Sequence, residues 1–260
     1  MEIVNSCTFA NGTVYCLRTE QDNLIETTDT FLPYYTKNST NGNNLLTSGD
    51  LGNREERWMI GVSTMSGCPL KCKFCATGNM RKSRLLTADE ITEQVFFILN
   101  KNPSYYPEEA KEFKINYTRM GEPFLNIKAV REAIERISAR YPNTHHYVST
   151  IGVKGSDFSW VTENVTLQIS LHACSDEKRD FLIPYKKKMT IEELGQIRTR
   201  SKQKTTLNLT LVDETDFDLD VLKRYFDPEH FFIKLSPINP NEFSDKNLLG
   251  EGVIKVKNLV

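Results

Sequence analysis

Cys68, Cys72 and Cys75 lie within eight positions of one another, in the segment SGCPLKCKFCATG, and make up half of the six cysteines of the 260-residue chain. A structural zinc site normally uses four protein ligands, and this sequence has no second cysteine pair that would complete one. A cubane iron–sulfur cluster suits several thiolates from one loop, because each cysteine binds a different iron. Three ligands leave one iron open, which favours a cluster that binds a substrate or cofactor over a zinc ion that braces the fold.

The elements around this cysteine loop alternate between strand and helix. The first predicted helix opens with a capping box of Thr87 and Glu90. This alternation predicts a parallel sheet, in which sites lie at the carboxyl ends of the strands. The predicted strands span 59–64, 114–119, 145–153, 165–173, 205–212 and 230–237, and the predicted helices span 86–100, 127–140 and 189–202.

Residues 1–57 differ in character from the rest of the chain. Short β segments surround Asn11 and Gly12, a pair typical of a type I′ hairpin turn, and a polar, loop-like stretch follows at 37–53. We therefore predict an N-terminal β-hairpin extension and loop at 1–57, a core domain at 58–240 and a C-terminal tail at 241–260.

Composition limits the class of protein. The chain is 39% hydrophobic and 26% charged, with a net charge of −1, as expected of a globular protein. It has no apolar run long enough to cross a bilayer, and its first residues lack the pattern of a signal peptide. We therefore expect a cytoplasmic protein with no membrane segment, in which clustered cysteines bind metal or catalyse. The near-neutral charge argues against nucleic-acid binding by bulk electrostatics.

The C-x3-C-x2-C spacing, with Phe74 just before the third cysteine, resembles the signature of the radical SAM superfamily. This resemblance implies a 4Fe-4S cluster on Cys68, Cys72 and Cys75, with S-adenosylmethionine (AdoMet) bound at the free iron. It also implies reductive cleavage of AdoMet to methionine and a 5′-deoxyadenosyl radical, which abstracts hydrogen from a substrate. The electron would come from an external flavodoxin-like or ferredoxin-like donor. The implied fold is α/β, a partial (β/α)6 barrel with a short N-terminal β extension.

Four further motifs give a narrower resemblance, to the radical SAM methyltransferases that modify carbon-2 or carbon-8 of adenine in RNA. They are RMGEPFLN (119–126), YVSTIGV (147–153), LQISLHACSDEKRDFLIPYKKKMTIEEL (167–194) and LSPINPNEF (235–243). The resemblance implies an RNA or nucleotide substrate and a carboxylate that faces the AdoMet ammonium. The residues that match the AdoMet pocket are Gly121, Glu122, Ser149, Ser170, Leu171, His172 and Asn239.

Two departures from this family concern its catalytic thiols. The methyltransferases carry the methyl group on a cysteine near the C-terminus and use a second cysteine seven residues before the cluster motif. Here Gly61 occupies the second position, no cysteine follows Cys174, and the family's helical N-terminal domain has no counterpart. We therefore expect radical chemistry with an altered reaction or substrate.

Two residues are candidate catalytic groups. Cys174 lies two residues after His172, where the family usually has proline, and its thiol could donate hydrogen or accept a methyl group. The alternative is a small buried side chain, the commoner role of a cysteine outside a disulfide. Glu26 resembles a carboxylate that the family is proposed to use as proton acceptor, and the alternative is an exposed strand glutamate.

Three functions stay open from the sequence. The first is a radical SAM enzyme with altered chemistry or substrate. The second is an RNA adenine methyltransferase whose missing thiol comes from Cys174 or from a partner chain. The third is a non-catalytic protein that binds the cluster or AdoMet as a sensor.

Overall fold

A computed structural model of the chain describes residues 1–34, 51–211, 217–237, 241–247 and 249. The chain forms two compact units. The first unit contains Met1–Ser66, Leu85–Met120 and Asn126–Tyr147, and the second contains Gly67–Arg84, Gly121–Leu125 and Val148–Val260.

The first unit combines an antiparallel extension with the start of the parallel sheet. β1 pairs antiparallel with β2, β2 with β3 and β3 with β4, whereas β4 pairs parallel with β7. Its strand order is β1-β2-β3-β4-β7-β8. The bounds are β1 (Glu2–Phe9), β2 (Gly12–Arg18), β3 (Leu24–Leu32), β4 (Arg57–Gly61), β7 (Glu112–Tyr117) and β8 (Thr144–Thr150).

Alternating side chains explain how these strands form the core. In β7 the side chains of Phe113, Ile115 and Tyr117 are buried and alternate with partly exposed neighbours, as expected of a strand with one face on the core. Trp58 of β4 is fully buried, and its indole N–H donates to Asp29 Oδ1 of β3 at 2.8 Å. These two buried polar side chains are thus paired as well as packed.

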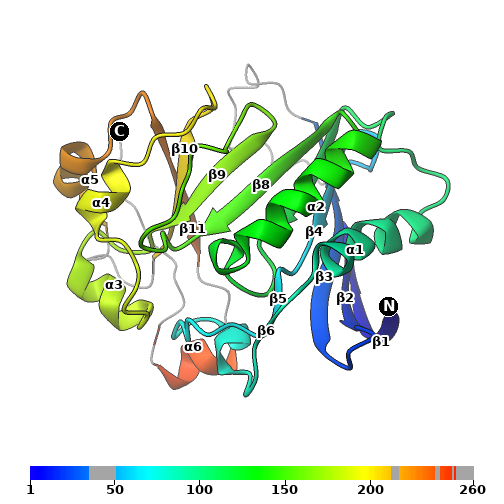
Figure 1. Ribbon diagram of the computed structural model, residues 1–260, viewed down its shortest axis with the longest axis horizontal. Helices are drawn as coiled ribbons and strands as arrows, with labels where there is room; N and C mark the ends of the chain where they lie inside the picture. Colours follow the sequence, from blue (N-terminus) through cyan, green and yellow to red (C-terminus); the bar gives the residue numbers. More distant parts are fainter. Residues whose placement is uncertain (35–50, 212–216, 238–240, 248, 250–260) are drawn as a thin grey trace. The chain divides into compact units, whose positions relative to one another are not determined.

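Two long helices belong to the first unit, α1 (Ala88–Lys101) and α2 (Ile127–Arg140), and they lie side by side (Figure 1). The capping box of α1 is present: Thr87 Oγ1 accepts from Glu90 N, and Glu90 Oε2 accepts from Thr87 N. Its buried positions include Ile91, Val95 and Ile98, which lie on one face at helical spacing.

The second unit continues the parallel arrangement. β9 (Val165–Ser170) and β11 (Phe231–Pro237) both pair parallel with β10 (Thr205–Leu211), and the strand order is β8-β9-β10-β11. The short strands β5 (Met65–Ser66) and β6 (Arg84–Leu85) bound the cysteine loop in sequence. The shorter helices are α3 (Asp176–Leu182), α4 (Ile191–Gly195), α5 (Leu219–Tyr225) and α6 (Glu242–Lys246), and two 3₁₀ turns cover Ala76–Asn79 and Pro123–Leu125.

The predicted fold class is confirmed: the sheet is mostly parallel, alternates with helices and carries an antiparallel N-terminal extension. All six predicted strands are present, and the second predicted helix matches α2. No helix within the described ranges has the length and apolar character needed to cross a membrane. The domain boundaries at residues 57 and 240 stay predictions.

The helix predicted at 189–202 is shorter in the structure, because α4 ends at Gly195. A Cβ on Gly195 would lie 2.1 Å from the Tyr225 carbonyl oxygen, so the backbone of α5 approaches closely there. The Arg198 guanidinium donates to the carbonyls of Gly195 and Ile197 at 2.9 and 2.8 Å. A side chain thus satisfies the carbonyls that a continued helix would have bonded internally.

Candidate functional site

The cysteine loop is held by its own backbone. Gly67 has a φ of +74°, and a Cβ there would lie 2.2 Å from the Lys82 carbonyl oxygen, so only glycine fits this close approach. Cys75 N donates to the Cys72 carbonyl at 3.1 Å, and Asn79 Nδ2 donates to the Cys75 carbonyl at 3.1 Å. These bonds fold the three-cysteine segment into a compact turn.

The thiols are partly withdrawn from water and close enough to influence one another. Burial, opposed by a backbone hydrogen bond from Leu70 and assisted by the Cys75 and Glu122 charges, raises the pKa of Cys68 to about 12. Burial also raises the pKa of Cys72 well above its usual value, with added contributions from Cys75, Cys68 and Glu122. A cationic metal group at this loop would stabilise the thiolates and so lower the pKa values of the cysteines.

The donor set fits a cubane cluster better than a single metal ion. Within the described ranges, no three His, Cys, Asp or Glu side chains converge as ligands of one ion. A 4Fe-4S cluster does not require that convergence, because each thiolate binds a different iron. Cys68, Cys72 and Cys75 are therefore the side chains suited to hold it.

Glu122 presents a buried carboxyl beside the cysteine loop. It follows Gly121, whose φ is +103°, and only 3% of its surface is exposed. Its Oε1 accepts from Phe124 N at 3.1 Å and its Oε2 from Ile151 N at 3.0 Å. Burial raises its pKa to about 7 against these bonds and one from the Thr150 side chain. A bound cation would favour the carboxylate form.

His172 lies against the cysteine loop from another side. Its ring packs edge-on to Phe74, with the ring centroids 4.9 Å apart and an interplanar angle of 71°. Its Nδ1 accepts from Thr210 N at 3.1 Å, and burial, followed by the Arg179 charge, lowers its pKa to about 3. The neutral imidazole therefore carries its proton on Nε2 and presents that N–H as a donor.

The other predicted AdoMet residues occupy the ends of β8 and β9. Ser149 Oγ donates to Gln168 Oε1 at 3.3 Å, and Ser170 is the last residue of β9. The backbone N–H groups of Leu171 and His172 both donate to the Asn208 carbonyl of β10, at 2.9 and 3.1 Å. Asn239 lies outside the described residues.

The two candidate catalytic residues lie in different units. Cys174 belongs to the second unit, as the cluster cysteines do, and its side chain is buried with 6% exposure. Glu26 lies on β3 of the first unit, where its Oε2 pairs with Arg119 Nη2 at 2.6 Å. Their catalytic roles stay predictions.

Three residues that shape this site are absent from the predicted set. Thr150 is the neighbour of Ser149 on the opposite face of β8, and its side chain bonds Glu122. Arg179 lies inside the long motif at 167–194, but nothing in the sequence shows that it is buried. Asn241 Nδ2 donates to the Phe74 carbonyl at 3.0 Å, a contact between residues far apart in sequence that no local pattern predicts.

The position of Gly61 is already filled by its neighbours. A Cβ there would lie 2.3 Å from Thr28 Oγ1 and 3.0 Å from Arg119 Cδ. The Gly61 N–H donates to the same Thr28 hydroxyl at 3.1 Å. A cysteine at this position would therefore require both side chains to move.

Comparison with known proteins assigns the family. The model of the radical SAM superfamily matches residues 62–225, a span that includes the cysteine loop, Glu122 and the Ser170–His172 run. The chain belongs to the radical SAM superfamily. Membership of this enzyme superfamily implies a 4Fe-4S cluster and AdoMet as cofactors.

Radical SAM relatives of this chain include curated RNA methyltransferases. The "probable dual-specificity RNA methyltransferase RlmN" of Pseudothermotoga lettingae is 33% identical over 193 residues, which cover 68% of this chain and 54% of that protein. The protein of the same name from Chlorobium phaeobacteroides strain BS1 is 33% identical over 198 residues, covering 72% and 54%. The chain therefore spans about half the length of the curated relatives it matches.

A solved radical SAM methyltransferase shares the fold. The crystal structure of that enzyme from Sphaerobacter thermophilus matches with a TM-score of 0.65 and 25% sequence identity, covering 92% of this chain and 67% of the neighbour. The chain is thus similar to radical SAM methyltransferases in both sequence and fold.

Proposed function

We propose that this chain is a radical SAM enzyme that cleaves AdoMet reductively and directs a 5′-deoxyadenosyl radical at a substrate, in a reaction altered from that of the RNA adenine methyltransferases. RNA, nucleotides and nucleosides are the first substrate classes to consider, because the RlmN-named relatives are RNA methyltransferases. The proposal includes a low-potential electron donor of the flavodoxin or ferredoxin type and a location in the reducing cytoplasm.

One arrangement carries the proposal: the cysteine loop lies next to both predicted AdoMet-binding elements. Phe74, between the second and third cysteines, packs on His172. The Glu122 charge acts on the Cys68 and Cys72 thiols. A small molecule that reaches the open iron would therefore meet a buried carboxyl and an imidazole N–H donor.

Each element of the site has a proposed task. Cys68, Cys72 and Cys75 hold the cluster, which supplies the electron for AdoMet cleavage when bound. The buried Glu122 carboxylate accepts a charge-assisted hydrogen bond from the AdoMet ammonium. Ser149, Leu171 and His172 bind and orient the rest of the cofactor and keep water away, as do Gly121, Ser170 and Asn239.

The proposal that the reaction is altered rests on Gly61. The resemblance places a catalytic cysteine at this position, whereas Thr28 and Arg119 fill its space here. The runner-up function is RNA adenine methylation through a substitute thiol, for which Cys174, buried two residues after His172, is the candidate within the chain.

The deciding experiment measures 5′-deoxyadenosine formed by anaerobically reconstituted protein with AdoMet and dithionite, with and without RNA or nucleosides. The control is the Cys68→Ala/Cys72→Ala/Cys75→Ala variant. We expect formation by the wild type and none by the control. A second arm supplies methyl-labelled AdoMet and RNA, and it separates the altered reaction from RNA adenine methylation. Label that enters RNA with the wild type and disappears with Cys174→Ala supports methyl transfer through Cys174.

The opposite outcome would also be informative. If a fully loaded cluster yields no 5′-deoxyadenosine with any of these additions, radical catalysis is contradicted. A cluster-binding or AdoMet-binding sensor would then be the better description of the chain.

A further inference from the structure

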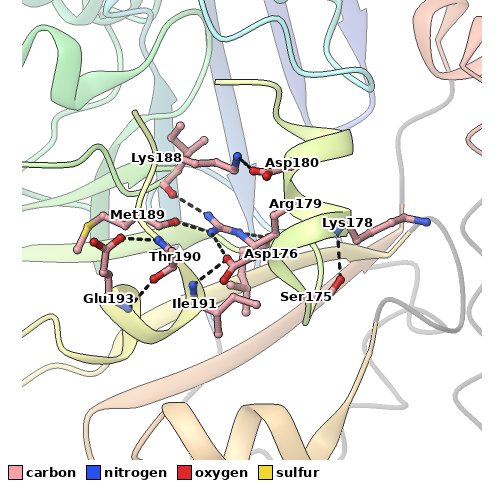
Figure 2. A network of polar contacts seen from close by, with 12 residues as sticks. Ser175, Asp176, Lys178, Arg179, Asp180, Lys188, Met189, Thr190, Ile191 and Glu193 are labelled. Carbon is pink, nitrogen blue, oxygen red and sulfur yellow. Dashed lines mark hydrogen bonds and ion pairs between the residues drawn. The ribbon is translucent and has the colours of Figure 1, made fainter. Parts of the chain in front are cut away.

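Arg179 of α3 is a charged side chain with no exposed surface. Its guanidinium donates three hydrogen bonds, all to backbone carbonyls: Nε to Leu171 at 3.1 Å, Nη1 to Met189 at 2.7 Å and Nη2 to Ile151 at 3.0 Å (Figure 2). The three carbonyls belong to three separate segments, after β9, before α4 and after β8. One planar group therefore fixes the spacing of three chain segments at once.

Two of these segments carry predicted AdoMet-binding groups. The Ile151 carbonyl accepts from Arg179, while the Ile151 N–H donates to Glu122 Oε2 at 3.0 Å. The Leu171 carbonyl precedes His172, which has a φ of +62°, a conformation that is costly for a residue with a Cβ. The hydrogen bond to the Leu171 carbonyl fixes the peptide that leads into this turn.

The charge of Arg179 faces three carbonyl dipoles and the charges of two carboxylates, Asp176 and Asp180. Its carboxylate partner, Asp176, lies 3.7 Å away with 49% of its side chain exposed, and the same carboxylate also accepts from Ile191 N at 3.0 Å (Figure 2). Removing a buried guanidinium would leave three buried carbonyls without their donor. A lysine would supply one point donor in place of a fork and could not reach all three.

We propose that Arg179 is a positioning residue that sets the geometry of the AdoMet pocket by fixing the Ile151 peptide behind Glu122 and the Leu171 peptide before His172. This inference rests on the proposed function. Arg179 touches neither the cysteine loop's thiols nor, in this scheme, AdoMet itself. Its loss is therefore expected to weaken AdoMet binding without removing the cluster ligands.

The test compares Arg179→Lys with Lys188→Met, each reconstituted anaerobically. Lys188 is a matched control because it is also a buried cation of the second unit, but its side-chain ion pair is with Asp180 (Figure 2). For each protein, iron content, Tm by circular dichroism and the Kd for AdoMet by equilibrium dialysis are measured. Loss of charge-assisted hydrogen bonds predicts that Arg179→Lys retains iron but binds AdoMet about tenfold more weakly.

The control separates positioning from stability. We expect Lys188→Met to lower Tm while its Kd stays within about twofold of the wild type. The inference is overturned if the Kd of Arg179→Lys is unchanged. It is also overturned if the Kd rises in proportion to the fall in Tm, to the same extent in both variants. If the wild type itself does not bind AdoMet, the proposed function fails, and that result is distinct from a failure of the Arg179 role.

A measurement on the wild type keeps the test independent of variant folding. Amide hydrogen exchange is followed by mass spectrometry with and without AdoMet. Through Arg179, bound AdoMet should protect the segment at Met189 together with those at Ile151 and Leu171. Protection confined to the segments at Ile151 and Leu171 would contradict the coupling, since Met189 is not among the predicted AdoMet residues.

Discussion

Glu122 shows how much of this site depends on the surroundings of a single side chain. A glutamate on an exposed loop is a carboxylate at neutral pH, whereas burial of Glu122 raises its pKa to about 7. Three donors from Thr150, Ile151 and Phe124 already orient its oxygens. The group is therefore held in place before a ligand arrives, which lowers the entropic cost of binding a cation there.

The first prediction concerns this residue. Glu122→Gln keeps the shape and loses the negative charge, so we expect the Kd for AdoMet to rise by about tenfold or more, the effect of a lost charge-assisted bond. Iron content should equal that of the wild type, because Glu122 is not a cluster ligand. Equilibrium dialysis with labelled AdoMet measures the change, and an unaltered Kd would remove Glu122 from the proposed pocket.

At the scale of elements, the cysteine loop is held by segments remote from it in sequence. Asn241 Nδ2 donates to the Phe74 carbonyl at 3.0 Å, and Asn247 Nδ2 donates to the Lys73 carbonyl at 2.9 Å. The Lys73 N–H donates to the Leu182 carbonyl at the end of α3, also at 2.9 Å. The residues that flank α6 thus join α3 in fixing the middle of the loop between two cluster cysteines.

The second prediction tests the hydrogen bonds from Asn241 and Asn247 to the cysteine loop. In Asn241→Ala/Asn247→Ala the loop loses two backbone-directed bonds, so iron should leave the reconstituted protein several-fold faster when a chelator is added. Lys246→Ala, an exposed change on α6, is the control and should release iron at the wild-type rate. Absorbance of the cluster against time gives the rates. Equal rates for all three proteins would show that the loop holds its conformation without α6.

At the scale of the whole molecule, buried histidines link stability to pH. His146 is fully buried, with Tyr117 Oη 3.2 Å from its Nδ1 and Ser138 Oγ 2.9 Å from its Nε2. Burial, followed by the charge of His145, lowers its pKa to about 3, and His172 is shifted in the same direction. Protonation therefore favours the unfolded chain, in which histidine has its ordinary pKa of about 6.5.

The third prediction follows from the sign of this shift. The stability from a neutral buried histidine is complete above about pH 6.5 and is lost as the pH falls toward 3. Between pH 7 and 5 we expect the free energy of unfolding to drop by up to about 2 kcal/mol for each such histidine. In His146→Gln the drop should be smaller, as measured by urea unfolding of the apo chain. An equal drop in both proteins would contradict this role.

The features of this protein that depend on local pattern could be predicted from its residues alone. The spacing of Cys68, Cys72 and Cys75 carried the resemblance to the radical SAM superfamily, which the match over residues 62–225 confirmed. Apolar β-rich runs predicted all six strands, and the pair Thr87 and Glu90 predicted the start of α1. Each of these signals is carried by residues near one another in the chain.

The properties that depend on burial and on contacts between distant residues became visible only in the folded chain. Burial among surrounding residues raises the pKa of Glu122. The guanidinium of Arg179 bonds backbone carbonyls of three separate segments. The helix predicted past Gly195 ends there, where the Tyr225 backbone leaves no room for a Cβ and the Arg198 side chain bonds the Gly195 and Ile197 carbonyls. Desolvation and close packing arise from residues far apart in sequence, so no local pattern could have specified them.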